Sequence, residues 1–137
     1  FANPVGSTTK QSLESLFDEL LKEKQDQEAI GASIDPVIRI RAVQTMFSPS
    51  QAVSFPYFLK KIITDSLKSE LKDNKSLNDL LEFELKIDRA NLVAFDIFVQ
   101  CREAVWGLKA NQEKTKIYKA FSRAGLVKDI PENGPEL

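Results

Sequence analysis

The sequence contains no histidine, and this absence excludes several kinds of site at once. Haem ligation by imidazole, zinc binding by imidazole and catalysis with an imidazole base all require that residue. Cys101 is the only cysteine, so an internal disulfide cannot form and a reducing, cytoplasmic location is expected. The sequence also has no Gly-rich phosphate loop, metal-ligand cluster or nucleophile elbow. We therefore predict a non-enzyme with no catalytic residues, no cofactor and no metal.

Neither sign of charge dominates the sequence. It has 19 lysine and arginine residues against 20 aspartate and glutamate residues, for a formal net charge of −1. This balance argues against a nucleic-acid footprint and against electrostatic attraction to a membrane surface. The most apolar stretch, residues 90–108, is too polar to span a membrane because it contains Asp96, Arg102 and Glu103. We expect neither nucleic acid nor membrane as a partner.

The length of 137 residues gives room for one domain with a core of moderate size. We predict that this domain covers residues 1–126 and that residues 127–137, with two prolines and a glycine, form a flexible tail. The sequence begins with Phe1 rather than methionine and shows no signal peptide. We therefore expect that an N-terminal part is missing.

One long helix is predicted from Ser76 to about Phe121. Ser76 and Asp79 have the spacing of a capping box, and no proline interrupts the segment. Apolar side chains return every three or four positions, as on one helix face: Leu77, Leu80, Leu81, Leu85, Leu92, Phe95, Val99 and Trp106. Most other positions in residues 90–108 are also apolar, so the helix needs cover around most of its circumference. It is either the central helix of a bundle or the seam between two copies.

We assign the dimer interface or core of this helix to five residues, Leu92, Phe95, Val99, Arg102 and Trp106. Arg102 falls on the apolar stripe, where an unpaired charge costs several kcal/mol, on the order of the penalty for a buried ion. We favour a structural pair with a carboxylate from another helix or from the partner chain. A ligand carboxylate or a signalling switch is the functional alternative.

Three further helices are predicted before the long one, at residues 8–24, 35–45 and 49–71. Asp35 and Pro36 have the pattern of an N-cap followed by a first-turn proline. Ser48 and Gln51 have the spacing of a second capping box. Pro56 lies inside the third of these helices and predicts a kink there. The short connection to the long helix favours an antiparallel hairpin.

A polar network is possible among Arg41, Gln44, Asp88 and Asp96. Arg41 and Gln44 fall where one predicted helix ends and the next begins, so we expect them to satisfy exposed backbone groups there. Asp88 is a candidate partner for Arg41, whereas Asp96 needs no role on a polar stripe. Cys101 is expected to be an inert, buried small hydrophobe. Aromatic side chains could line a cavity for an apolar ligand, but plain core is favoured: Phe55, Phe58, Phe83, Phe95, Phe98 and Trp106.

Three short motifs carry a family resemblance. They are Arg41-Ala42-Val43-Gln44, Ser48-Pro49-Ser50-Gln51-Ala52, and Ala94-Phe95-Asp96 followed by Cys101-Arg102-Glu103. With them, residues 13–125 resemble the N-terminal sensor domain of RsbR-type stressosome co-antagonists, in particular the RsbRD type. The resemblance implies an all-α, globin-like helical bundle without haem, dimeric, with a regulatory role. Such domains usually begin with one or two more helices than the sequence predicts here, and we predict no STAS domain within these 137 residues.

We interpret the chain as a sensory or regulatory module of bacterial signalling. It would act as a homodimer and through contacts with an unidentified regulatory protein. A signal would shift the packing of the two long helices, and residues 121–125 would pass the change on. Three alternatives remain open: a globin-like sensor for an apolar, fatty-acid-like ligand, an accessory subunit of a redox complex, and an enzyme with an unfamiliar site.

Overall fold

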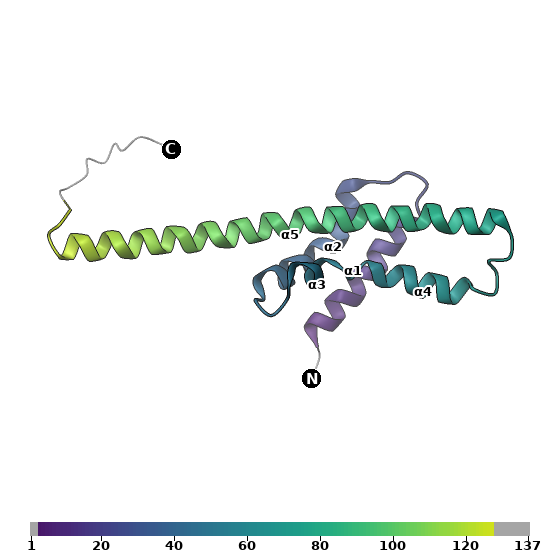
Figure 1. Cartoon of the computed structure of the whole chain (residues 1–137), viewed down its shortest axis with the longest axis horizontal. Coiled ribbons are helices and arrows are strands. Elements are labelled where there is room, and N and C mark those ends of the chain that lie inside the picture. Colours follow the sequence, from purple (N-terminus) through teal and green to yellow (C-terminus); the bar gives the residue numbers. More distant parts are fainter. Residues whose placement is uncertain (1–2, 128–137) are drawn as a thin grey trace. The chain divides into compact units, whose positions relative to one another are not determined.

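The computed structural model describes residues 3–127, and all regular elements in that range are α-helices (Figure 1). They are α1 (Pro4–Leu21), α2 (Gln27–Val43), α3 (Pro49–Val53), α4 (Tyr57–Leu67) and α5 (Asn74–Arg123). The prediction of an all-helical fold with one long C-terminal helix is thus confirmed. The chain divides into two compact units, Phe1–Arg102 and Glu103–Leu137, which are described separately below. The predicted tail, residues 127–137, lies outside the described residues apart from Val127.

Helix α1 begins four residues earlier than the sequence predicted. Asn3 is its N-cap, and the side-chain oxygen of Asn3 accepts a hydrogen bond from the amide of Gly6 at 3.1 Å. Pro4 follows in the first turn, where its missing N–H leaves no hydrogen bond unmade. The buried face of α1 consists of Ser12, Leu16 and Leu20.

Helix α2 shows that the predicted start at Asp35 and Pro36 was wrong. The N-cap is Asp26, which accepts hydrogen bonds from two first-turn amides, and Pro36 lies inside the helix. Asp35 instead pairs with Arg39 at 2.6 Å. A proline inside a helix costs roughly 3 kcal/mol, but burying each large apolar side chain returns roughly 1.5–3 kcal/mol. The buried stripe of α2 outweighs the proline: Ile30, Ile34, Val37, Ile38 and Ala42.

The segment from Ser48 to Leu67 contains two helices rather than one kinked helix. The capping box is confirmed, because the Ser48 hydroxyl accepts from the amide of Gln51 and the Gln51 side chain accepts from the amide of Ser48. Helix α3 then ends at Val53, and α4 begins after Pro56. Since Pro56 has no N–H to continue the ladder, and Phe55 before it is fully buried, the chain turns inward here instead of bending gently.

Helices α4 and α5 form the antiparallel hairpin that the short connection predicted. Lys60 pairs with Asp88 at 2.5 Å, and Thr64 donates a hydrogen bond to Glu84 at 3.5 Å. The partner number falls as the position along α4 rises, which is the signature of antiparallel neighbours. Asp73, rather than Ser76, caps α5: its carboxylate accepts from the amide of Ser76 at 2.6 Å, and this hydrogen bond lowers the pKa of Asp73.

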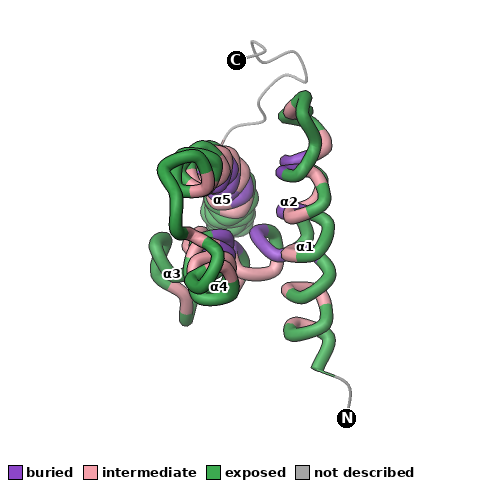
Figure 2. The backbone as a smooth tube through the Cα atoms, turned by 90° about the vertical axis from the view of Figure 1, so that its right-hand side faces the viewer, coloured by how far each residue is buried: buried purple, intermediate pink, exposed green. Residues whose placement is uncertain are grey.

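The core of the first unit lies along one stripe of α5. Figure 2 shows the buried residues on the sides of the helices that face one another. We call this α5 stripe the core stripe; it consists of Ile87, Ala90, Asn91, Ala94, Phe98 and Cys101. Gly31 of α2 faces α5, since a Cβ added there would lie at ordinary contact distance from Val93 and Ile97, 3.7 Å and 4.0 Å away. Helix α1 reaches α5 through an edge-to-face contact of Phe17 with Phe83, with ring centres 5.9 Å apart.

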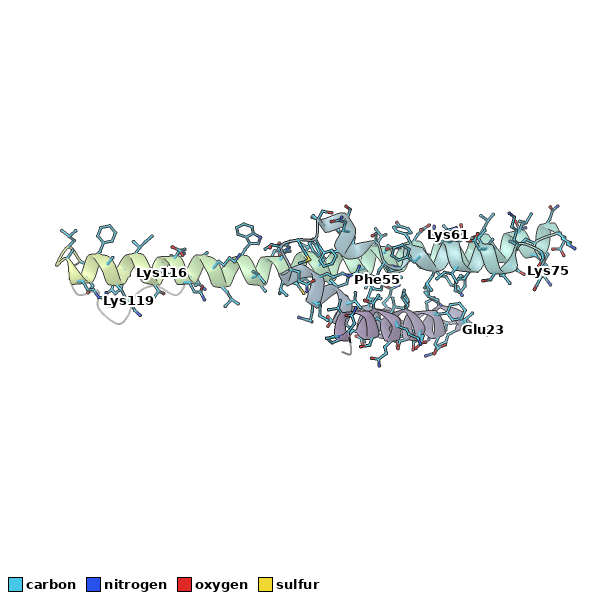
Figure 3. The ribbon with its side chains drawn as sticks, turned by 90° about the horizontal axis from the view of Figure 1, so that it is seen from below. Glu23, Phe55, Lys61, Lys75, Lys116 and Lys119 are labelled. Atoms are coloured by element: carbon cyan, nitrogen blue, oxygen red, sulfur yellow. The ribbon has the colours of Figure 1, made fainter. Side chains whose placement is uncertain are left out.

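The second unit is described as far as Val127, and its part of α5 is exposed along nearly its whole length. Lys116 and Lys119 stand out from the helix in Figure 3. Gly125 has φ +68 and ends the helix as the sequence predicted. The amide of Leu126 donates to the carbonyl of Phe121, and the amide of Gly125 donates to that of Ser122. These two hydrogen bonds are those of a Schellman motif.

Truncation of the fully buried Ile38 tests this core. We expect Ile38→Ala to lower the free energy of unfolding by roughly 2–5 kcal/mol, because a cavity remains where the side chain was. Urea denaturation followed by circular dichroism measures the change. Met46→Ala is the control, since Met46 is 79% exposed and its loss should change stability by less than about 0.5 kcal/mol. Equal effects of the two substitutions would contradict the assigned core.

Candidate functional site

A second apolar stripe on α5 faces solvent within the first unit. Leu85, Leu92 and Phe95 are 54%, 67% and 50% exposed, and Leu77 and Leu81 are also exposed. These are residues that the sequence pattern placed on the face to be covered. The other described segments of the chain leave them largely uncovered. We call the residues Leu81, Leu85, Leu92 and Phe95 the outer stripe.

The outer stripe and the core stripe lie on different sides of α5. At about 100° per residue, the outer stripe is centred roughly 130° around the helix from the core stripe. The periodicity of the sequence therefore contained two apolar faces, and the core proved to be the one with smaller side chains, such as Ala90 and Ala94. The larger leucines lie on the exposed outer stripe.

The remaining residues of the predicted interface have different surroundings. Val99 is half-buried, and the Arg102 guanidinium lies 5.3 Å from the centre of the Phe98 ring. Among residues 3–127 Arg102 forms no ion pair, and its contact there is the cation–π contact with Phe98. A pair with a carboxylate of a partner chain stays a prediction. Trp106, in the second unit, is 66% exposed, and Lys109 lies over its ring.

Arg41 joins α2 to the end of α3. Its Nη1 donates hydrogen bonds to the carbonyls of Gln51 and Ala52, at 3.2 Å and 3.4 Å. Its guanidinium also lies over the rings of Phe47 and Phe55, 5.5 Å and 5.3 Å from their centres. Burial lowers the pKa of Arg41, and its Nε has no hydrogen-bond partner among the described residues. Arg41 thus satisfies helix-end carbonyls, as its position between two helices suggested.

Among the described residues, Arg41 forms no hydrogen bond or ion pair with the other members of the suggested polar network. Asp88 pairs with Lys60 of α4 instead, Gln44 is the C-cap of α2, and Asp96 is exposed. Sequence spacing could not select the partner of Asp88, because Lys60 and Asp88 meet only when the α4–α5 hairpin has formed.

Cys101 and the aromatic residues divide between core and surface. Cys101 is buried on the core stripe, in agreement with an unreactive role. Phe55 and Phe98 are buried, and Phe83 packs against the core. Expecting the whole aromatic set to be core was wrong, since three of its members are mostly exposed: Phe58, Phe95 and Trp106.

An open groove lies between α1, α4 and the first turns of α5, all within the first unit. Its volume is about 920 Å³. The wall residues include Phe17 from α1, Ile62 from α4 and Phe83 from α5. Its apolar lining is Leu13, Phe17, Leu21, Leu59, Ile62, Ile63, Leu67, Leu71, Leu80 and Phe83. The sequence pattern did not reveal this groove, because it arises from the spacing of helices rather than from any one motif.

The described part of the chain offers no group of histidine, cysteine, aspartate or glutamate side chains that could hold a metal ion. No helix within residues 3–127 combines the length and the apolar character needed to cross a membrane. The candidate functional features of the first unit are the outer stripe of α5 and the groove.

This arrangement is that of an all-helical domain with a long C-terminal helix, and a comparison with protein families identifies its family. Residues 1–112 match the family described as the RsbT co-antagonist protein rsbRD N-terminal domain. The chain belongs to this family, and the resemblance noted from its motifs is confirmed. The family has a stressosome-related regulatory role. No curated protein and no solved structure matches the chain.

Arg41 and Arg39 provide a matched pair for a stability test. We expect Arg41→Met to lower the free energy of unfolding by roughly 1–3 kcal/mol, because the carbonyls of Gln51 and Ala52 lose a charged donor. Arg39→Met should have little effect, since the Arg39–Asp35 pair is on the surface. Thermal and urea denaturation of both variants measures the difference. A larger loss in the Arg39 variant would contradict the role of Arg41.

Proposed function

We propose that this domain is a non-catalytic regulatory module that works as a homodimer joined along the outer stripe of α5. The observation that carries the proposal is the exposure of Leu85, Leu92 and Phe95 on one side of a helix whose other side is already packed. Water-exposed apolar patches of this kind usually mark an interaction surface. Family membership supports a regulatory rather than a catalytic reading.

The spacing of the outer stripe favours a second copy of the same helix as its cover. Leu85, Leu92 and Val99 are seven residues apart, and Phe95 lies three positions after Leu92. This is the alternating three-and-four spacing by which two helices pack along a seam. Trp106 continues the seven-residue spacing into the second unit. A face repeated in this way is complementary to itself, as a two-fold symmetric interface requires.

The polar positions of this spacing are compatible with a seam. Asp88 falls between Leu85 and Leu92, but its charge is already paired with Lys60 of the same chain. Arg102 has its guanidinium against the Phe98 ring, so part of its side chain already lies on apolar surface. Neither charge would be left without a partner or a ring at the edge of the interface.

The expected gain is large enough for a dimer. Completing the burial of each large apolar side chain returns roughly 1–2 kcal/mol. With four such side chains from each of two copies, the gross gain is roughly 8–16 kcal/mol, whereas association costs roughly 4–15 kcal/mol. The two ranges overlap, so a seam along α5 would be of moderate strength. A moderate net free energy of dimerisation suits a regulatory domain in which a signal changes the packing of the two helices.

A paired substitution on the outer stripe tests the proposal. We expect the unmodified chain, of 15.4 kDa, to sediment as a dimer at tens of micromolar concentration. The double variant Leu92→Glu, Phe95→Glu should sediment as a folded monomer, because four carboxylates would meet in the seam. Analytical ultracentrifugation measures the mass, and circular dichroism confirms that the helices remain.

Val43→Glu, Met46→Glu is the matched control. Both residues are exposed apolar side chains, 61% and 79% exposed, and neither belongs to α5. This variant should remain dimeric. An unmodified chain that stays monomeric at high concentration, or a stripe variant that remains a dimer, would refute the proposed interface.

A further inference from the structure

The groove between α1, α4 and α5 continues the core face of α5 beyond the point where the chain covers it. Ser76, Leu80 and Phe83 line the groove and lie at helical spacing before Ile87, the first buried residue of the core stripe. Further along α5, Val93 and Ile97 are in contact range of Gly31 in α2. Along the groove that face lies open between α1 and α4. The groove is thus an uncovered continuation of the core face of α5.

Large apolar side chains at the edges of the groove are left in solvent. Leu21 at the end of α1 is 58% exposed, and Ile62 in the middle of α4 is 56% exposed. Both line the groove. Their exposure would be relieved by an occupant that lies between α1 and α4 and brings its own apolar side chains.

The charge at the rim distinguishes between kinds of occupant. Glu14, Glu70 and Asp79 line the groove, with Lys10 as the only basic lining residue. Lys10 lies 3.8 Å from Glu14, so its charge is partly offset there. The rim is therefore acidic. A fatty-acid carboxylate would meet charge of its own sign, whereas lysine and arginine side chains would be attracted.

We propose that this groove binds an amphipathic helix of a partner protein, with apolar anchors on one face and lysine or arginine residues beside them. The anchors would occupy the groove floor around Phe17, Ile63 and Phe83, and the basic side chains would face Glu14, Glu70 and Asp79. Helix-in-groove recognition has this form in general: apolar side chains at i, i+3, i+4 and i+7 supply the contact area. The site is separate from the outer stripe, because Ser76, Leu80 and Phe83 lie on another side of α5 from Leu85 and Leu92.

Binding of two designed peptides tests the proposal. One is an 18-residue helix with leucine at i, i+3, i+4 and i+7 and lysine elsewhere; the other has the same leucines with glutamate elsewhere. Fluorescence anisotropy with the full chain should show binding of the lysine peptide and at least about tenfold weaker binding of the glutamate peptide. Raising the salt concentration should weaken binding of the lysine peptide, since the rim charges are exposed to solvent and are screened by salt.

Two sets of variants locate the binding. The double variant Leu21→Ser, Ile62→Ser removes apolar edge contacts and should weaken binding of the lysine peptide about tenfold. The control variant Val43→Ser, Met46→Ser should leave the affinity for this peptide unchanged. Glu14→Gln, Glu70→Gln, Asp79→Asn keeps the groove shape and should reduce the difference between the two peptides. Glu23→Gln, Glu28→Gln, Glu103→Gln is its control, with exposed acidic residues that do not line the groove.

Several outcomes would overturn the proposal. Equal affinity of the two peptides, or no binding of either, would show that the acidic groove does not select a basic helix. Binding that survives the Leu21, Ile62 variant would place the peptide elsewhere. Palmitate retained in native mass spectrometry and lost in that variant would assign the groove to a lipid. Loss of peptide binding in the Leu92→Glu, Phe95→Glu variant, with the groove variant unaffected, would assign it to the outer stripe.

Discussion

The packing of the core stripe of α5 against the earlier helices is the contact on which the rest of the first unit depends. Ala90, Ala94 and Phe98 of this stripe are buried together with the apolar side chains of α2, and Gly31 of α2 faces Val93 and Ile97 of α5. Because this face is satisfied within one chain, the larger leucines of α5 must lie on another side of the same helix. The described segments of the first unit cover the core stripe and leave the outer stripe exposed.

Polar contacts in the first unit mostly position helix ends rather than build a reactive centre. Arg41 donates to the carbonyls at the end of α3, Lys86 donates to the carbonyl of Leu20 at the end of α1, and Asp73 accepts from an amide at the start of α5. Each contact supplies a partner to a backbone group that a helix terminus leaves unpaired. Contacts that fix helix ends in this way are compatible with the regulatory role of the family.

The proposals for the two surfaces differ in the physical term that gives specificity. The outer stripe is almost wholly apolar and repeats at seven residues, so its selectivity would come from matching shape and spacing. The groove combines an apolar floor with an acidic rim, so its selectivity would come from the sign of charge on the occupant. The two surfaces use separate stripes of α5, so the two proposals can be tested independently.

The sequence alone determined the all-helical class, the long C-terminal helix, the capping box at Ser48, the glycine end at Gly125 and the family, because each depends on local spacing or a short motif. The sequence did not predict the start of α2 correctly, because Asp35 and Pro36 carry a strong local cap signal. The burial of Ile30 and Ile34 in one helix outweighs that signal. Only the tertiary structure decided which apolar face of α5 is core, that Asp88 meets Lys60, and that a groove opens beside Phe83. These features depend on distances between helices, and periodicity along one helix carries no information about which neighbour will cover it.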